Sequence, residues 1–315
     1  MAKPSVLLTK RIPRSAFTRL EADCDVDLND RETDLTPDEL IERVRGKQGL
    51  IALLTNAVNK DVIAAGSDLK VIANIAVGYN NIDVPSARAR GIIVTNTPDV
   101  LTESSADLTW ALILGITRRV VEGDRLVRAN QWKGWALDFM LGTELGGKQL
   151  GIIGMGRIGR AVATRAQAFG MRVAYTSRTP QEIANAEQMP FDRLLSTSDV
   201  VSLHCPLTPD TKHLINQPAF ARMKRSAYLV NTSRGPVVDE AALAWALKNH
   251  LIAGAALDVY EEEPKVHPDL LSLENVLLAP HLGSATTETR TAMADLAVRN
   301  AIAVLTGQPP LTPVG

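Results

Sequence analysis

Short apolar runs alternate with segments of helical spacing through the first 99 residues. The predicted strands are Val6–Leu8, Val26–Leu28, Leu50–Leu54, Val71–Ile75 and Ile92–Val94. The helices predicted between them are Arg14–Glu21, Pro37–Arg45, Lys60–Ala65 and Val84–Arg90. Strands that alternate with helices predict a parallel sheet with both faces covered.

A long helical stretch follows, from Leu101 to about Ala129, with Thr102 as its expected N-cap. Gly115 and Gly123 interrupt it, so the pattern predicts either one broken helix or two helices. Residues 130–147 show no periodicity and carry Trp132, Trp135 and Phe139.

A second alternation then predicts a full doubly wound unit. Its expected strands are Leu150–Ile153, Arg172–Tyr175, Val200–His204, Tyr228–Asn231, Ala255–Asp258 and Val276–Ala279. The chain closes with an amphipathic helix over Thr286–Leu305 and a Pro-rich end.

A glycine motif lies between the first strand of this second half and the helix predicted over Arg157–Phe169. Gly154, Gly156 and Gly159 form G-x-G-x-x-G. The first glycine permits a tight turn, the second lets the backbone approach a pyrophosphate, and the third lets helix and strand pack closely. The free N–H groups of the helix N-terminus favour the same phosphates. A bare glycine-rich turn is the alternative, but the strand before the motif and the helix after it favour a dinucleotide site.

Composition excludes several classes of protein. Lys+Arg 34 and Asp+Glu 35 leave a net charge of −1, so no basic surplus indicates nucleic acid. Cys24 and Cys205 are too few for a disulfide framework and have no metal-ligand spacing, which favours a reducing compartment. The apolar runs are too short for a signal peptide or a membrane span. We expect a soluble, cytoplasmic protein without a metal site.

Candidate catalytic residues follow three strands of the second half, at the sheet edge where doubly wound folds bind ligands. Arg234 follows Tyr228–Asn231, Glu263 follows Ala255–Asp258, and His281 follows Val276–Ala279. Arg suits a substrate carboxylate, and His is the usual proton donor near neutral pH. A carboxylate beside the His fixes its orientation. These types fit reduction of a 2-oxo acid by a nicotinamide hydride.

Each of these residues also has an ordinary structural interpretation. Arg234 fits a solvated loop charge, Glu261–Glu263 an acidic turn, and His281 a satisfied polar residue. Their joint position at one edge favours the catalytic interpretation. His204 also ends a strand, where it either approaches the cofactor or caps the strand.

Several motifs in fixed order resemble the D-isomer-specific 2-hydroxyacid dehydrogenases, above all the glyoxylate/hydroxypyruvate reductase (2-ketogluconate reductase) branch. Besides the glycine motif, the matching stretches are Val77–Asp83, Asn96–Pro98 with Ala106-Asp107, Leu203–Thr208, Asn231–Gly235, Leu257–Val259, Glu262–Pro264 and Pro280–Ser284. The resemblance covers essentially the whole chain.

The resemblance implies an α/β fold of two doubly wound parallel-sheet domains with a cleft between them. A flavodoxin-like substrate-binding domain would comprise residues 1–99 and 285–315, and a Rossmann-type NAD(P)-binding domain residues 100–284. It also implies a homodimer built through residues 101–145, with Phe139 as the aromatic residue that reaches the partner's active site.

The resemblance further assigns site residues. Arg234, Glu263 and His281 take the catalytic positions, and the backbone at Leu53, Val77 and Gly78 contacts the substrate carboxylate. The expected cofactor contacts are Ser105, Gly154, Gly156, Arg157, Ile158, Gly159, Ser177, Arg178, Thr179, Pro206, Thr211, Thr232, Asp258, His281 and Gly283. Asp258 is expected to face the nicotinamide carboxamide.

One position departs from the pattern of NAD-using enzymes. An acidic residue usually follows the second strand and bonds the ribose 2′-hydroxyl, but Ser177, Arg178 and Thr179 stand there. These side chains would bind a 2′-phosphate that a carboxylate would repel, which predicts a preference for NADP(H). The alternative is that Arg178 points to solvent and both cofactors are used.

The sequence is also compatible with other functions. D-3-phosphoglycerate dehydrogenase or another D-2-hydroxyacid dehydrogenase is a near alternative, and formate or phosphite oxidation a more distant one. A binding protein that senses nicotinamide nucleotides, like the family's corepressors, is a non-enzymatic alternative. Spacing alone does not identify the 2-oxo acid.

Overall fold

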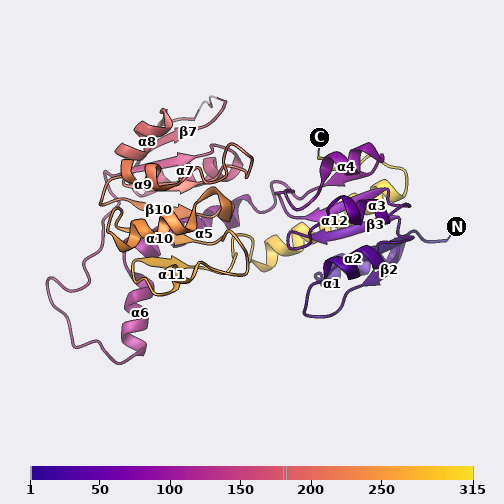
Figure 1. Ribbon diagram of the computed structural model, residues 1–315, viewed down its shortest axis with the longest axis horizontal. Helices are drawn as coiled ribbons and strands as arrows, with labels where there is room; N and C mark the ends of the chain where they lie inside the picture. The colour runs from indigo at the N-terminus through magenta and orange to yellow at the C-terminus, as the bar shows by residue number, and fades with distance from the viewer. Residues whose placement is uncertain (1, 180, 182, 315) are drawn as a thin grey trace. The chain divides into compact units, whose positions relative to one another are not determined.

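The computed structural model separates the chain into two compact units, each built on one parallel sheet (Figure 1). Unit 1 comprises Met1–Leu101 and Ala285–Gly315, and unit 2 comprises Thr102–Ser284. The structure describes residues 2–179, 181 and 183–314. None of the helices in these ranges is both long enough and apolar enough to span a membrane.

Unit 1 has a five-stranded sheet in the order β2-β1-β3-β4-β5. The strands are β1 (Ser5–Leu8), β2 (Asp25–Leu28), β3 (Gly49–Leu53), β4 (Val71–Ile75) and β5 (Ile93–Thr95). The helices are α1 (Arg14–Asp23), α2 (Pro37–Arg43), α3 (Lys60–Ala65), α4 (Val84–Ala89) and α12 (Thr287–Leu305). This strand order is that of a flavodoxin-like doubly wound sheet, as predicted.

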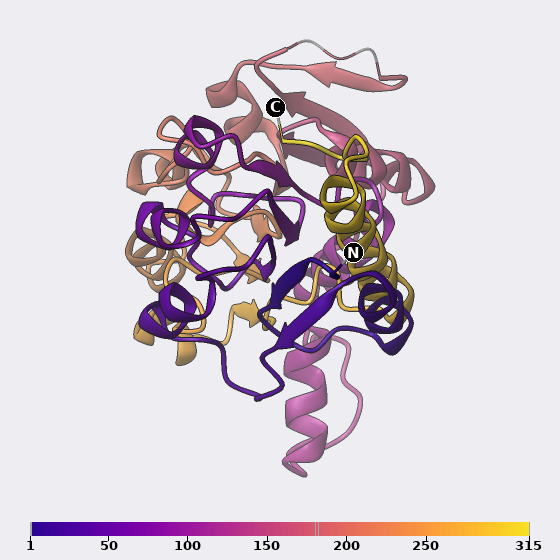
Figure 2. The same ribbon diagram turned by 90° about the vertical axis from the view of Figure 1, so that its right-hand side faces the viewer.

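Local sequence signals set the helix boundaries of unit 1. Thr36 forms a capping box with Glu39 at the start of α2, and Asn59 and Asp83 cap α3 and α4 through their side chains. The C-terminal helix α12 returns to this unit and packs beside α1 (Figure 2). Residues from both ends of the chain therefore complete one fold.

Unit 2 has a seven-stranded sheet in the order β12-β11-β10-β9-β6-β7-β8. Its strands are β6 (Gln149–Ile153), β7 (Arg172–Thr176), β8 (Ala186–Gln188), β9 (Val200–Leu203), β10 (Tyr228–Asn231), β11 (Gly254–Leu257) and β12 (Val276–Leu278). Counted from β6, the order is the 3-2-1-4-5-6 arrangement of a Rossmann fold with one further strand. The predicted α/β class with two doubly wound sheets is confirmed.

Helices cover both faces of this sheet. They are α5 (Thr102–Thr117), α6 (Val120–Arg128), α7 (Arg157–Ala168), α8 (Phe191–Thr197), α9 (Gln217–Arg222), α10 (Glu240–Lys248) and α11 (Pro268–Leu271). One apolar core lies between the sheet and α5 and α7, and a second lies against α8, α9 and α10. Because both faces are buried, the strands of this sheet are mostly apolar rather than alternating.

Two local features differ from the sequence-based expectations. The edge strand β8 was not predicted, because Ala186–Gln188 has no apolar run and becomes a strand by pairing with β7. The long helical stretch does form two helices, but neither glycine breaks it. The break lies at Arg119, which has a φ of +54° and is the N-cap of α6, whereas Gly115 and Gly123 lie inside α5 and α6.

Packing explains why Gly115 is tolerated inside α5. A Cβ at this position would lie 2.8 Å from the Cδ1 atom of Leu277, which lies in β12. The last carbonyl of α5 finds its partner far along the chain, because the Thr143 N–H donates to the Thr117 carbonyl at 2.8 Å. The segment between them, α6 and residues 129–142, extends from the body of unit 2 (Figure 1).

Candidate active site

Arg234, Glu263 and His281 lie in loops that leave the carboxyl ends of β10, β11 and β12. These strands are neighbours in the parallel sheet, so all three loops emerge at the same edge. The glycine motif leaves the carboxyl end of β6 and therefore belongs to that edge as well. The fold thus gathers residues that are up to 127 positions apart, from Gly154 to His281.

His281 and Glu263 are joined by a hydrogen bond. The Nδ1 atom of His281 lies 2.7 Å from an Oε atom of Glu263, and the other Glu263 oxygen accepts the Tyr260 N–H at 3.1 Å. Burial by itself raises the pKa of Glu263. The bond with His281 and the positive charges of His281 and Arg234 outweigh that effect and hold the pKa below its ordinary value. The carboxylate is therefore ionised near neutral pH and can orient the imidazole, which leaves Nε2 for a proton transfer.

The Arg234 loop is shaped by a buried asparagine. Asn231 donates from its amide to the Arg234 carbonyl at 3.0 Å, and its oxygen accepts the Ser233 N–H at 3.0 Å. Burial lowers the pKa of the Arg234 guanidinium, while the charge of Glu263 opposes that shift. An arginine keeps its charge throughout this range. Arg234 therefore supplies a permanent cation beside Glu263.

Gly235 lets the Arg234 loop pack directly on the loop that carries Glu263. A Cβ at Gly235 would lie 1.8 Å from the carbonyl carbon and from the oxygen of Tyr260. No side chain fits in that space. The separation of the two loops, and hence of Arg234 and Glu263, depends on this contact between backbones.

Asp258 holds the loop that carries His281. Its carboxylate accepts the Leu282 N–H at 2.6 Å and the Gly283 N–H at 2.9 Å, and its carbonyl accepts the His281 N–H at 2.9 Å. His281 has a φ of +54°, a conformation that few residues other than glycine adopt. Burial raises the pKa of Asp258, against the effects of the two N–H groups and of His281. Its predicted contact with a nicotinamide carboxamide stays a prediction.

Glu240 is a supporting residue that the sequence analysis missed. It is 6% exposed, and its carboxylate accepts the Glu261 N–H at 2.7 Å and the His267 N–H at 3.1 Å. The Glu261 carboxylate accepts the Glu240 N–H at 2.8 Å in return. These bonds fix the loop that carries Glu263. The only signal in the sequence was an acidic residue beginning a helix, which is too common to identify a role.

The glycine motif has the geometry expected of a phosphate-binding turn. Gly154 has a φ of +96°, and a Cβ there would lie 2.5 Å from the Cys205 nitrogen. A Cβ at Gly159 would lie 2.3 Å from the Gly154 oxygen, whereas nothing lies within 4 Å of one at Gly156. Gly156 begins α7 without a side-chain cap. Gly154 and Gly159 therefore serve the turn, and Gly156 leaves space and free N–H groups for a pyrophosphate.

The structure brings several of the other predicted cofactor residues together. The Ser105 hydroxyl donates to the Gly283 carbonyl at 3.3 Å, and Thr109 links Ser105 to Thr232 with its hydroxyl 2.9 Å from that of Thr232. The remaining predicted contacts at this sheet edge are Arg157 and Ile158 at the start of α7, Ser177, Arg178 and Thr179 after β7, and Pro206 and Thr211 after β9. Thr211 donates to the Pro206 carbonyl at 2.7 Å, which closes the turn between them.

His204 acts as a structural residue next to the glycine turn. Its Nε2 lies 2.8 Å from the Ser202 hydroxyl, and its N–H donates to the Ile153 carbonyl at 2.7 Å. Desolvation lowers the pKa of His204 to about 4. Its ring is therefore neutral at pH 7 and is unsuited to proton donation there.

The three predicted substrate residues outside unit 2 gather at the carboxyl edge of the unit 1 sheet. Leu53 ends β3, and Val77 and Gly78 follow β4. The Leu53 N–H donates to the Asn56 side chain at 2.9 Å, and its carbonyl accepts from Asn81 at 3.2 Å. Both backbone groups of Leu53 are thus engaged within unit 1, so neither is free for the predicted contact with the substrate carboxylate. The roles of all three residues stay predictions.

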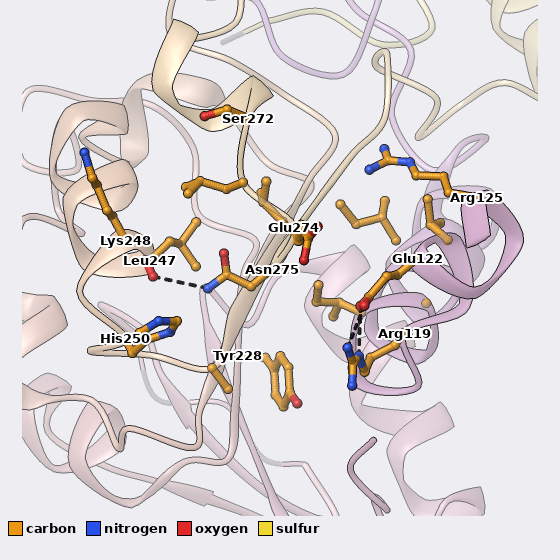
Figure 3. Close-up of a pocket in the computed structure, with 17 residues that line it drawn as sticks. Arg119, Glu122, Arg125, Tyr228, Leu247, Lys248, His250, Ser272, Glu274 and Asn275 are labelled. Atoms are coloured by element: carbon orange, nitrogen blue, oxygen red, sulfur yellow. Dashed lines mark hydrogen bonds and ion pairs between the residues drawn. The ribbon is translucent and has the colours of Figure 1, made fainter. Parts of the chain in front are cut away.

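A large cavity in unit 2 is remote from the loops that carry Arg234, Glu263 and His281. It encloses about 470 Å³ between α6 and the segments that lead into β10, β11 and β12, at the opposite edge of the sheet (Figure 3). Arg119 and Glu122 pair with one another there, and Lys248 and Arg125 lie on opposite sides of the space (Figure 3). Its charged groups do not converge on one point, so the cavity does not compete with the strand-end loops as the active site.

Comparison with known proteins identifies the family to which the chain is similar. A sequence model described as D-isomer specific 2-hydroxyacid dehydrogenase, NAD binding domain, matches residues 110–283. A glyoxylate reductase from Korarchaeum cryptofilum is 49% identical over 315 residues, which cover 98% of this chain and 95% of the relative. The matched domain contains the glycine motif and all three candidate catalytic residues.

Solved structures show the same fold. A protein from Thermus thermophilus superposes with a TM-score of 0.94 at 46% identity, covering 99% of this chain and 100% of its own. An NADPH-dependent glyoxylate/hydroxypyruvate reductase from Sinorhizobium meliloti, crystallised with NADP and malonate, gives a TM-score of 0.89 at 36% identity. That match covers 100% of this chain and 97% of the reductase.

Proposed function

Because the chain belongs to the D-isomer specific 2-hydroxyacid dehydrogenase family, we propose that it reduces glyoxylate, hydroxypyruvate and similar small 2-oxo acids to D-2-hydroxy acids. It is an NAD(P)-dependent oxidoreductase of this family. The observation that carries the proposed substrate class is the Glu263–His281 pair, joined at 2.7 Å on the sheet edge that also holds Arg234 and the glycine motif. The similarity to glyoxylate reductases over nearly the full chain supports it.

The proposed roles follow from the chemistry of each side chain. Arg234 binds the substrate carboxylate and polarises the adjacent carbonyl with its planar cationic fork. His281 donates the proton that the carbonyl oxygen needs as it becomes a hydroxyl. Glu263 orients the imidazole and stabilises its protonated form. The backbone N–H groups of Val77 and Gly78 contribute further donors to the carboxylate.

The cofactor assignment has a physical basis in the glycine turn. Gly154, Gly156 and Gly159, with Arg157 and Ile158 at the helix start, would hold the pyrophosphate. A bound nicotinamide supplies the hydride of the reaction. We assign the cofactor site, Arg234 and His281 to unit 2, and the backbone N–H contacts to the substrate carboxylate to unit 1.

NADP(H) is the proposed preferred cofactor. The loop after β7 presents Ser177, Arg178 and Thr179, of which Arg178 and Thr179 are exposed. The Ser177 hydroxyl donates to the Thr179 carbonyl at 2.6 Å, which folds the loop on itself. No carboxylate stands at these three positions to repel a 2′-phosphate, and Arg178 offers a charge-assisted hydrogen bond to one.

Steady-state kinetics with glyoxylate and each reduced cofactor test the substrate and the cofactor together. We expect turnover with both cofactors and a higher kcat/KM with NADPH. Arg178→Ala should lower kcat/KM for NADPH by roughly 10- to 100-fold, as for the loss of one hydrogen bond to a charged group, and leave NADH nearly unchanged. Arg172→Ala, at the other end of β7, is the matched control. A wild-type preference for NADH would refute the cofactor proposal, and no turnover with any small 2-oxo acid would refute the proposed function.

A homodimer is the proposed assembly. We call residues 120–142 the arm. Its exposed apolar side chains include Val120, Val127, Trp132, Trp135, Leu137, Phe139 and Leu141. Trp135 and Leu137 are each 82% exposed. Monomeric proteins rarely expose so much contiguous apolar surface without a binding partner. We propose that a second copy covers this surface, with Phe139 as a contact to the partner.

Sedimentation velocity measures this assembly directly. Wild-type protein should sediment as a species of twice the chain mass at micromolar concentration. Trp135→Ser combined with Leu137→Ser should shift it to the monomer, because the exposed apolar area that drives association is lost. Leu271→Ser, which removes an exposed leucine of α11 outside the arm, is the control. A monomeric wild type would contradict the proposal.

A further inference from the structure

The loop after β4 has three consecutive carbonyl groups tied down by the protein. The Ala76 carbonyl accepts the Thr97 N–H at 2.9 Å. The Val77 carbonyl accepts the Asn96 side-chain amide at 2.8 Å, and the Gly78 carbonyl accepts that of Asn74 at 2.9 Å. Every donor belongs to unit 1, in β4 or just after β5.

Because the peptide bond is planar, the direction of each held carbonyl also fixes the direction of the N–H group that follows it. In a trans peptide the carbonyl and the following N–H point in opposite directions. The N–H groups of Val77, Gly78 and Tyr79 are therefore turned away from the groups that hold the carbonyls. Within the described residues these three N–H groups have no protein acceptor, and the loop becomes more exposed from Val77 to Tyr79. Unpaired backbone N–H groups are strong hydrogen-bond donors, and these three are available to a bound anion.

A pair of side-chain amides fixes the orientation of Asn74. Asn74 is completely buried, and its amide and that of Asn81 exchange hydrogen bonds of 3.1 and 3.2 Å. Asn81 also donates to the carbonyls of Leu53 and Asn56 at 3.2 and 3.1 Å. A flipped Asn74 would lose its bond to Gly78 and oppose like groups across the pair. The end of β3 thus helps to lock the loop after β4.

We propose that Asn74 and Asn96 are positioning residues that hold the N–H groups of Val77, Gly78 and Tyr79 as a preformed cradle for the substrate carboxylate, with Asn81 locking Asn74. This inference rests on the proposed reduction of 2-oxo acids and adds Tyr79 N–H as a third donor. We call Asn74 and Asn96 the tethers. Donors that are already oriented lose little freedom when the anion binds, so the tethers increase the affinity for the substrate. They touch no reacting atom, so they act on the hydride-transfer step only through substrate position.

Substitution of the tethers separates positioning from general stability. Asn96→Ala frees the Val77 carbonyl, and we expect KM for glyoxylate to rise about 3- to 10-fold, the range of one hydrogen bond, with kcat and KM for NADPH within about twofold of wild type. Asn96→Asp, which has no amide donor, should behave similarly. Asn29→Ala is the matched control, because the side-chain amide of Asn29 also holds backbone carbonyls of unit 1, those of Thr9 and Thr33, both at 3.1 Å.

Hydrogen exchange provides a readout that does not depend on turnover. With NADP⁺ present, oxalate should slow exchange of the Val77, Gly78 and Tyr79 amides in wild type and in Asn29→Ala, and much less in Asn96→Ala. Asn74→Ala should lose the same protection; thermal unfolding alongside Asn29→Ala shows that it folds. Turnover by wild type with an unchanged KM in both tether variants, or no oxalate effect on these amides, would overturn the cradle while the proposed function stands. Absence of wild-type turnover would instead count against the proposed function.

Discussion

Replacing His281 by Asn is expected to lower kcat by about 100- to 10,000-fold, the contribution of a well-placed general acid, while the cofactor still binds. Asn is chosen over Ala because His281 has a φ of +54°, and Asn adopts this left-handed conformation more readily than Ala does. The amide keeps a polar group near Glu263 but has no proton to transfer at neutral pH. Steady-state kcat with glyoxylate, and fluorescence titration with NADPH, measure the two effects separately.

The chain provides a closely matched control for this substitution. His213 has a φ of +50°, and its Nε2 lies 2.9 Å from a Glu261 oxygen, so it also is a histidine paired with a carboxylate in the left-handed region. His213→Asn should retain most of the turnover. Equal losses in the two variants would mean that the His281 effect is structural, and near-normal turnover in His281→Asn would remove it as the acid.

Gly235→Ala is expected to reduce both stability and turnover, although it adds a single methyl group to a residue that touches no substrate. The new Cβ would lie 1.8 Å from backbone atoms of Tyr260, so the Arg234 loop and the Glu263 loop must move apart. Overpacking of this kind costs about 1–3 kcal/mol or more. A shift of about 1 Å between catalytic groups can reduce the rate roughly 100-fold. Thermal unfolding and kcat, measured on the same preparation, give the two quantities.

Gly146→Ala is the control for this substitution, because a Cβ at Gly146 would meet nothing within 4 Å. It should leave both the unfolding temperature and kcat close to wild type. A Gly235→Ala protein with reduced stability and unchanged kcat would show that the separation of the two loops does not matter for the reaction. Unchanged values of both quantities would show that the loops accommodate the methyl group.

Periodicity predicted most of the secondary structure, because strands such as Val71–Ile75 and helices such as Lys60–Ala65 are bounded by local signals. The two departures have tertiary causes. Ala186–Gln188 is a strand only because β7 offers it an edge, and α5 ends where Thr143, 26 residues further along, meets the Thr117 carbonyl. Such contacts leave no periodic signal in the segment that they determine.

The candidate catalytic residues could be named from the sequence because their chemistry and their positions after strands are both local properties. Arg234, Glu263 and His281 follow strands, and parallel strands bring their carboxyl ends to one edge. Glu240 could not be named, since its role consists of bonds to the N–H groups of Glu261 and His267 in a distant loop. Leu53 could be named from the sequence, but its hydrogen bonds could not. Only the structure shows that its N–H and carbonyl are already bonded to Asn56 and Asn81.

By itself, the sequence determined the class of fold, the glycine turn and the identity of the candidate pair Glu263–His281, because each is set by residue type and short-range spacing. The tertiary structure decided how these parts are held. It placed Glu263 2.7 Å from His281, forced a glycine at position 235 against Tyr260, and turned the peptide groups of residues 76–79 through Asn74, Asn96 and Thr97. The physical reason is that hydrogen-bond direction and steric exclusion depend on atoms that are brought together only by the folded chain.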